Sequence, residues 1–84
     1  MVRRVVLKPR AERDISDLPI ETATRVCNAL RRLAEANLGD VRKLQGVDPP
    51  EYRLRIGDYR VRFQLTADAI EVLRVLPRGG VYRD

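Results

Sequence analysis

The chain has 84 residues, of which 44% are hydrophobic, so it can form one small core, and its composition excludes a disordered chain. Its 17 Lys and Arg against 12 Asp and Glu give a net charge of +5, which predicts a nucleic acid, an acidic protein or an anionic membrane as partner. With no histidine and Cys27 as the only cysteine, a zinc site, a histidine base and an internal disulfide are excluded, and no metal or cofactor is expected.

The first part of the sequence predicts a strand followed by a short helix. The segment Val2–Leu7 is short and rich in β-branched residues, which is typical of a strand. Pro9 suits the first turn of a helix, and apolar residues follow it at helical spacing. Pro19 breaks that helix or begins the next one.

A second, longer helix is predicted from Glu21 to about Ala36. Apolar residues recur there every three or four positions, which gives the helix one apolar stripe. Asn37 and Gly39 follow as stop signals. Because Pro19 leaves only a short connection between the two helices, we expect an antiparallel helical hairpin.

Two further segments complete the predicted elements around the central hairpin. The segment Gly39–Pro50 contains Gly, Asp and a Pro-Pro pair, so a loop is predicted. Arg42 and Lys43 lie within it and are candidate contacts for RNA phosphates. The segment Ala69–Leu76 is almost continuously apolar, which predicts a strand near the centre of the sheet.

The segment Tyr52–Leu65 alternates apolar and polar residues on both sides of Gly57-Asp58, which predicts a β-hairpin with a type II′ turn. Its predicted register places arginines directly opposite each other on one face, in the pairs Arg55–Arg60 and Arg53–Arg62. Opposed like charges destabilise a sheet by roughly 0.2 to 1 kcal/mol per pair. Arg62→Ala is therefore expected to stabilise the free protein, and a polyanionic ligand would explain the arginine face.

The element order predicts an α+β fold in one domain, residues 1–84. It consists of an N-terminal strand, an antiparallel helical hairpin and a three-stranded antiparallel meander, with the helices packed on one face of the sheet. The opposite face then carries the arginines of the hairpin. Since the chain has neither a transmembrane-length apolar run nor a signal-peptide core, we expect a soluble, cytoplasmic protein without a membrane partner.

Four stretches of the sequence resemble the RelE/ParE toxin superfamily of type II toxin–antitoxin systems. They are PRAERDISDLP near the start, RKLQG, YRLRIGDYRVRF and LRVLPRGGVYR at the end. The resemblance covers nearly the whole chain and implies a RelE-like fold. It further implies a ribosome-dependent mRNA endonuclease that acts in the ribosomal A site without a metal, by attack of a ribose 2′-OH. A cognate RelB-like antitoxin is the implied partner.

The resemblance also implies which residues act. The catalytic set that it implies is Arg53, Arg55, Arg60, Arg78 and Tyr82. The residues that we expect to bind RNA are Arg42, Lys43, Arg53, Arg55 and Arg62. The chain departs from the family pattern at Pro77, where many members have His or Lys, and at Gly79, where a second arginine is common.

Two other functions fit the same sequence. A ParE-type toxin would inhibit DNA gyrase through a protein contact and would need no RNA site. A nuclease-inactive member would keep only antitoxin binding. The arginine face has an ordinary explanation as well, because charged residues on one face of a hairpin are often just solvated.

Overall fold

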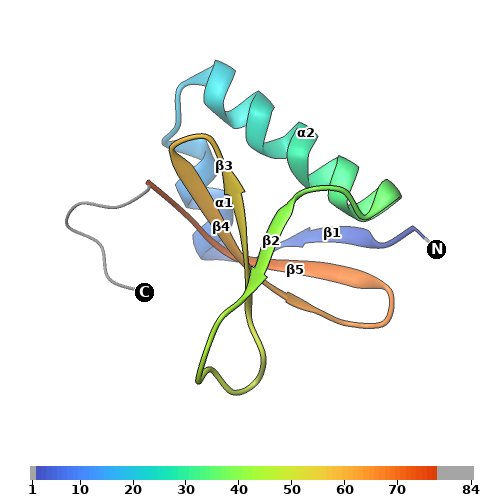
Figure 1. Cartoon of the computed structure of the whole chain (residues 1–84). Helices are drawn as coiled ribbons and strands as arrows, with labels where there is room; N and C mark the ends of the chain where they lie inside the picture. Colours follow the sequence, from blue (N-terminus) through green and yellow to red (C-terminus); the bar gives the residue numbers. More distant parts are fainter. Residues whose placement is uncertain (1, 78–84) are drawn as a thin grey trace.

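A computed structural model describes residues 2–77 of the chain; Arg78, Gly79 and Tyr82 lie outside this range. Two helices and five strands make up the described fold (Figure 1). In chain order they are β1 (Arg4–Leu7), α1 (Pro9–Ser16), α2 (Ile20–Ala36), β2 (Asp40–Lys43), β3 (Tyr52–Ile56), β4 (Tyr59–Leu65) and β5 (Ala69–Pro77).

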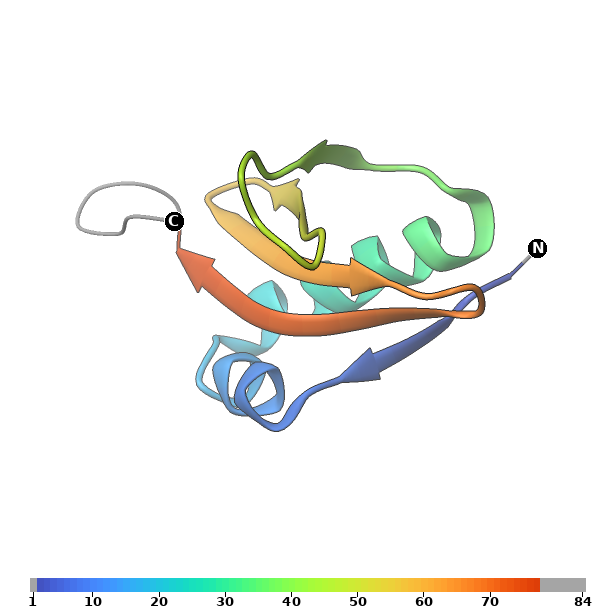
Figure 2. The ribbon, with the colours of Figure 1, turned by 90° about the horizontal axis from the view of Figure 1, so that it is seen from below.

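The strands form one sheet in the order β1-β5-β4-β3-β2. β1 pairs with β5 in parallel, and the other neighbours are antiparallel. β5 therefore has a neighbour on each side, which confirms the interior position predicted from its apolar run. The sheet is strongly twisted, and the first strand lies beside the last described one (Figure 2).

The loop predicted over Gly39–Pro50 is wrong at its beginning, because Asp40–Lys43 forms β2. This strand pairs with β3, so the meander has four strands rather than three. Within β2 only Val41 is apolar, and it lies opposite Leu54 on the helix side of the sheet. Four residues of which only one is apolar show no alternation of apolar and polar positions. This edge strand therefore forms because it pairs with β3, and not because its own residues favour a strand.

Both helices begin and end close to the predicted positions. Pro9 is the first residue of α1. Asn37 caps the C-terminal end of α2 in the left-handed conformation, with a φ of 56°. The Asn37 N–H donates to the Leu33 carbonyl at 3.0 Å, so one of the last carbonyl groups of α2 has a hydrogen-bond donor. Three residues, 17–19, join the helices, but Figure 2 shows the two helices at a wide angle and not side by side as in a helical hairpin.

The core lies between the two helices and one face of the sheet. The helices contribute Ala11, Val26, Ala29, Leu30, Leu33 and Ala34. The sheet contributes Leu54, Val61, Phe63, Ile70, Val72 and Val75. Burial of each large side chain stabilises the fold by about 1.5 to 3 kcal/mol. The helices therefore cover one face, and the other face, which we name the outer face, carries the polar residues of the strands.

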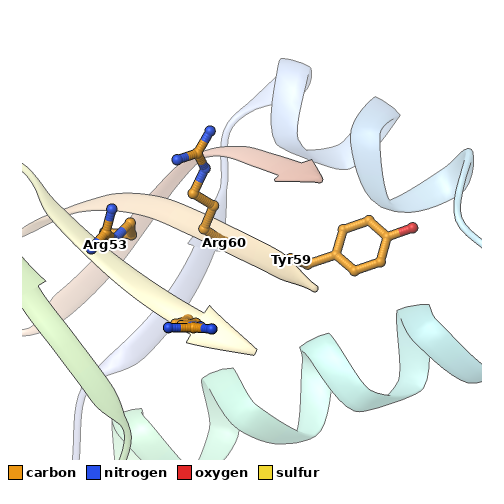
Figure 3. Close-up of a pocket in the computed structure, with 4 residues that line it drawn as sticks. Arg53, Tyr59 and Arg60 are labelled. Carbon is orange, nitrogen blue, oxygen red and sulfur yellow. The ribbon is translucent and has the colours of Figure 1, made fainter. Parts of the chain in front are cut away.

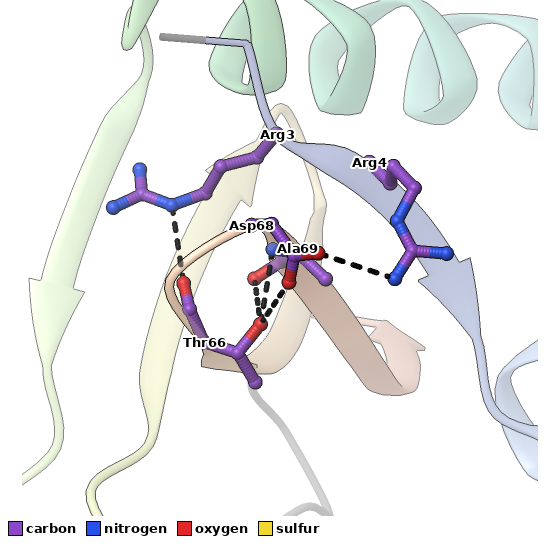
Figure 4. A network of polar contacts seen from close by, with 5 residues as sticks. All are labelled: Arg3, Arg4, Thr66, Asp68 and Ala69. Atoms are coloured by element: carbon purple, nitrogen blue, oxygen red, sulfur yellow. Dashed lines mark hydrogen bonds and ion pairs between the residues drawn. The ribbon is translucent and has the colours of Figure 1, made fainter.

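The turn between β4 and β5 is attached to the N-terminal segment (Figure 4). The Thr66 hydroxyl accepts a hydrogen bond from the Ala69 N–H at 3.0 Å. Arg3 Nε donates to the Thr66 carbonyl at 3.4 Å, and Arg4 lies 3.6 Å from the Asp68 carboxylate. These contacts hold the start of β1 beside the start of β5. No helix within residues 2–77 is long and apolar enough to cross a membrane.

Candidate functional site

The β3–β4 hairpin has the predicted register. Arg55 lies opposite Arg60, and Arg53 lies opposite Arg62. Gly57 has a φ of 54° at the first turn position, as a type II′ turn requires. The turn therefore needs glycine for its backbone conformation, whereas the Arg25 guanidinium near it belongs to a flexible side chain that can move away.

Four arginines lie in one row across the outer face. Their directly paired positions on β2, β3, β4 and β5 are Arg42, Arg53, Arg62 and Arg74. We name this set the arginine row. Sequence analysis missed Arg74, because it interrupts an otherwise apolar strand. That interruption was the available signal, since a charged residue inside a buried strand must reach a partner or the surface.

The β4 and β5 members of the row are bound by carboxylates. Arg62 Nη2 donates to Glu51 Oε1 at 2.6 Å, and both side chains are largely buried. Arg74 Nε donates to Asp14 Oδ2 at 2.8 Å. Each carboxylate neutralises its arginine, so this half of the row carries little net charge.

Burial of Asp14 acts to raise its pKa, but hydrogen bonds from Arg74 and from the Val75 N–H oppose this effect. The positive charges of Arg74 and Arg10 act in the same direction as these hydrogen bonds. Together they hold the pKa of the Asp14 carboxyl below its usual value of 3.8. Asp14 is therefore ionised at neutral pH.

A cationic cavity of about 140 Å³ opens on the hairpin and is lined by Arg53, Arg55, Tyr59 and Arg60. In Figure 3 the Arg53 and Arg60 side chains project to the same side of the sheet, whereas the Tyr59 ring points toward the helices. Within residues 2–77, no hydrogen bond or ion pair holds the Arg53 or Arg55 guanidinium. Both are therefore available to an anion, and arginine suits phosphate because its donors form a planar fork.

The structure brings only some of the predicted residues together. Arg53, Arg55 and Arg60 line one cavity, and Arg42 lies beside Arg53 in the arginine row. Lys43 is paired with Tyr52, so it lies in a row on the helix side of the sheet. Tyr52 itself stacks on Phe63, with ring centroids 5.6 Å apart.

Of the remaining predicted residues, Arg62 is bound to Glu51, and Arg78 and Tyr82 lie outside the described residues. Among residues 2–77, no group of three or more His, Cys, Asp or Glu could hold a metal ion.

Residues 5–82 match the family model described as the ParE toxin of the type II toxin–antitoxin system parDE. The chain belongs to this toxin family. Membership places it in the RelE/ParE superfamily, as the four sequence stretches implied, and makes it the toxin of a type II toxin–antitoxin system.

Three of the solved structures with the same fold are toxin–antitoxin complexes. The archaeal RelE–RelB complex of Pyrococcus horikoshii matches with 29% identity and a TM-score of 0.78, over 94% of this chain and 98% of that one. RelBE2 of Mycobacterium tuberculosis matches with 23% identity and a TM-score of 0.79, over 93% and 100%. The Methanococcus jannaschii RelB–RelE complex has 22% identity and a TM-score of 0.71, over 86% and 88%. No significant match was found among curated proteins.

Proposed function

We propose that this toxin is a ribosome-dependent endonuclease that cuts mRNA in the ribosomal A site and so inhibits translation. The observation that carries the proposal is the cavity lined by Arg53, Arg55 and Arg60, in which two guanidinium groups have no partner among residues 2–77. The phosphodiester of an RNA substrate would be a negatively charged partner for these guanidinium groups. The net charge of +5 supports a polyanionic substrate.

The proposed reaction is attack of a ribose 2′-OH on the adjacent phosphate. The hydroxyl loses its proton, the O–P bond forms, and the bond from phosphorus to the 5′-oxygen breaks as that oxygen gains a proton. Negative charge grows on the phosphate oxygens in the transition state. Fixed cationic donors such as Arg60 stabilise that charge, and the loss of one such donor typically costs on the order of a hundredfold in rate.

The arginines can stabilise charge in this mechanism, but they cannot take up the proton of the 2′-OH. A guanidinium does not lose its proton in proteins, so Arg53 and Arg55 grip the substrate and stabilise charge but do not act as the general base. Arg78 remains a predicted second phosphate ligand, and Tyr82 remains a predicted residue for stacking on a base. The proton transfers must come from other groups, among which we include those of the ribosome.

We further propose a cognate RelB-like antitoxin as the protein partner. The support is the set of solved relatives that are RelE–RelB complexes. An acidic or amphipathic antitoxin segment would complement the basic outer face and would cover the arginines. Mixing the purified toxin and its antitoxin should give a complex on size exclusion. Separate elution of the two proteins would contradict this partner.

A second candidate function is inhibition of DNA gyrase. The match of residues 5–82 to a ParE toxin model favours it. A gyrase inhibitor would act through a protein contact, so it would cause DNA breaks in cells and would leave mRNA intact. A member that has lost both activities and keeps only antitoxin binding would produce neither effect.

The deciding experiment is primer extension on an mRNA bound to programmed ribosomes. Wild type should produce cuts that depend on the ribosome, and Arg60→Ala should lose them. Arg32→Ala is the matched control, because it removes the same charge from an exposed position on α2. Toxicity together with gyrase-linked DNA breaks and uncut mRNA would favour the ParE-type activity instead.

A further inference from the structure

The edge of β5 changes its neighbour halfway along the strand. β1 pairs with β5 only as far as Leu7 opposite Val72, and the Lys8 N–H then donates to the Val72 carbonyl at 2.9 Å. Pro9 begins α1 directly afterwards, so no strand within residues 2–77 covers the edge of the second half of β5. The backbone N–H groups on that edge need other acceptors, because an unpaired buried amide is costly.

Asp14 of α1 supplies an acceptor at this edge. Its Oδ2 atom accepts a hydrogen bond from the Val75 N–H at 2.9 Å and one from Arg74 Nε at 2.8 Å. Its Oδ1 atom lies 3.4 Å from Arg74 Nη2, so the arginine is held by two of its nitrogens. One side chain thus replaces the missing strand and fixes the β5 member of the arginine row.

The segment that Asp14 holds lies beside the candidate site. Val75 pairs with Val61, and Leu76 pairs with Arg60. Pro77 is the last residue of β5 and directly precedes Arg78 in the sequence. A displacement of this end of β5 would therefore move the strand that lies beside Arg60.

We propose that Asp14 is a positioning residue of the toxin: by binding Val75 and Arg74 it fixes the end of β5, and with it the placement of the neighbouring Arg60 on the substrate phosphate. The inference rests on the proposed nuclease function. Asp14 lies on the helix that covers the sheet edge, so it touches no substrate and acts only through β5.

The loss of the carboxylate has two consequences for the site. The Val75 N–H loses its acceptor, so the strand end is released from α1. Arg74 loses the carboxylate that binds two of its nitrogens, so its guanidinium is no longer held against α1. Both effects shift the phosphate ligands, and a displacement of about 1 Å at a reacting group can cost on the order of a hundredfold in rate.

The experiment compares Asp14→Asn and Asp14→Ala with Asp17→Asn in the full chain. Asp17 is exposed at the end of the same helix, and its substitution removes the same charge. Two properties are measured: hydrogen exchange of the Val75 and Leu76 amides in the free toxin, and kcat and KM for mRNA cleavage on programmed ribosomes.

We expect faster exchange at Val75 in both Asp14 variants and normal exchange in Asp17→Asn. We also expect kcat to fall about tenfold to a hundredfold with KM nearly unchanged, and Asp14→Asn to be less affected because its amide oxygen can still accept the Val75 N–H.

Unchanged exchange at Val75 would overturn the structural part of the inference, whatever the activity. Faster exchange with full kcat would overturn the role in positioning. A wild-type toxin that cuts no mRNA would overturn the proposed function and the positioning role with it, and the exchange data would still show whether Asp14 holds β5. Equal losses of activity in Asp17→Asn and Asp14→Asn would point to net charge as the cause and would also contradict the inference.

Discussion

Arg53 and Arg62 are directly opposed on adjacent strands of the outer face, but their surroundings differ. Arg62 is bound at 2.6 Å by Glu51, whereas no residue of the described chain holds the Arg53 guanidinium. The same contrast extends along the arginine row, where Asp14 binds Arg74. Two arginines of the same row therefore differ in their contacts. The carboxylate of Glu51 binds Arg62 to the fold, whereas Arg53 is left available to a ligand.

The difference has a geometric origin. Glu51 lies directly before β3, and Asp14 lies on the helix at the edge of β5, so each can reach an arginine of β4 or β5. Among the described residues, the cavity on the hairpin is lined by three arginines and Tyr59, without a carboxylate. Neither arginine of β3 is therefore bound by a carboxylate of the described chain, and the proposed RNA phosphate would take that place.

The largest expected effect is on catalysis. Arg60→Ala and Arg53→Ala should each lower single-turnover mRNA cleavage by about a hundredfold, because each removes a cation from the proposed phosphate site. Arg62→Ala should lower it by no more than a few-fold, since that guanidinium is already bound to Glu51. Equal losses in Arg53→Ala and Arg62→Ala would remove the distinction between the two halves of the row.

The next effect is on stability. Arg62→Ala should lower the free energy of unfolding by about 1 to 3 kcal/mol, because it leaves the Glu51 carboxylate, whose side chain is 14% exposed, without its partner. This reverses the expectation from the hairpin register alone, in which Arg62 only repels Arg53. Arg53→Ala should leave the stability unchanged or raise it by a few tenths of a kcal/mol.

Chemical denaturation of the two variants measures this difference. The double variant Glu51→Ala/Arg62→Ala is the control, and it should recover part of the loss because no unpaired carboxylate remains.

The third effect is on the pH dependence of stability. The pKa of Asp14 is lower in the folded state than its usual value of 3.8, so its contribution is complete above that value and is lost as the pH falls through the folded pKa. The difference in unfolding free energy between wild type and Asp14→Asn should therefore be constant from pH 7 to pH 5 and should shrink below about pH 4. Denaturation curves at a series of pH values provide the measurement, and a difference that grows on acidification would contradict the assignment.

The smallest effect is on the response to salt. The Debye length falls from about 10 Å at 0.1 M salt to about 3 Å at 1 M, so salt weakens the repulsion between the arginines of the row. Added NaCl should raise the stability of the wild type by a few tenths of a kcal/mol and should raise that of Arg53→Gln less. An equal response in both proteins would show that repulsion along the row has no measurable cost.

The hairpin was predictable because residues close together in the sequence determine its strands, its turn and its register. The alternation around Gly57 sets which face each side chain takes, and the turn sets the register, so the pairs of Arg53 and Arg55 followed from the sequence. The helix ends were predictable for the same reason, since Pro9 and Asn37 act through their own backbone preferences.

The contact between Asp14 and Arg74 was not predictable in the same way. Asp14 and Arg74 are far apart in the sequence, and they meet only because α1 covers the edge of β5. β2 was missed because its four residues become a strand through pairing with β3. The sequence therefore predicted the hairpin arginines of the candidate site. Which arginines of the row are bound by a carboxylate depends on contacts that exist only in the folded chain.

The pairing of β1 with β5 has a consequence for the order of events during synthesis. β1 is made before the other described elements, and β5, its one neighbour in the sheet among residues 2–77, is made after them. An emerging chain can form α1, α2 and the β3–β4 hairpin early, because their contacts are local, but β1 and the Asp14 carboxylate stay without their partners. The nascent toxin thus cannot complete its outer face until residues 69–77 have been synthesised.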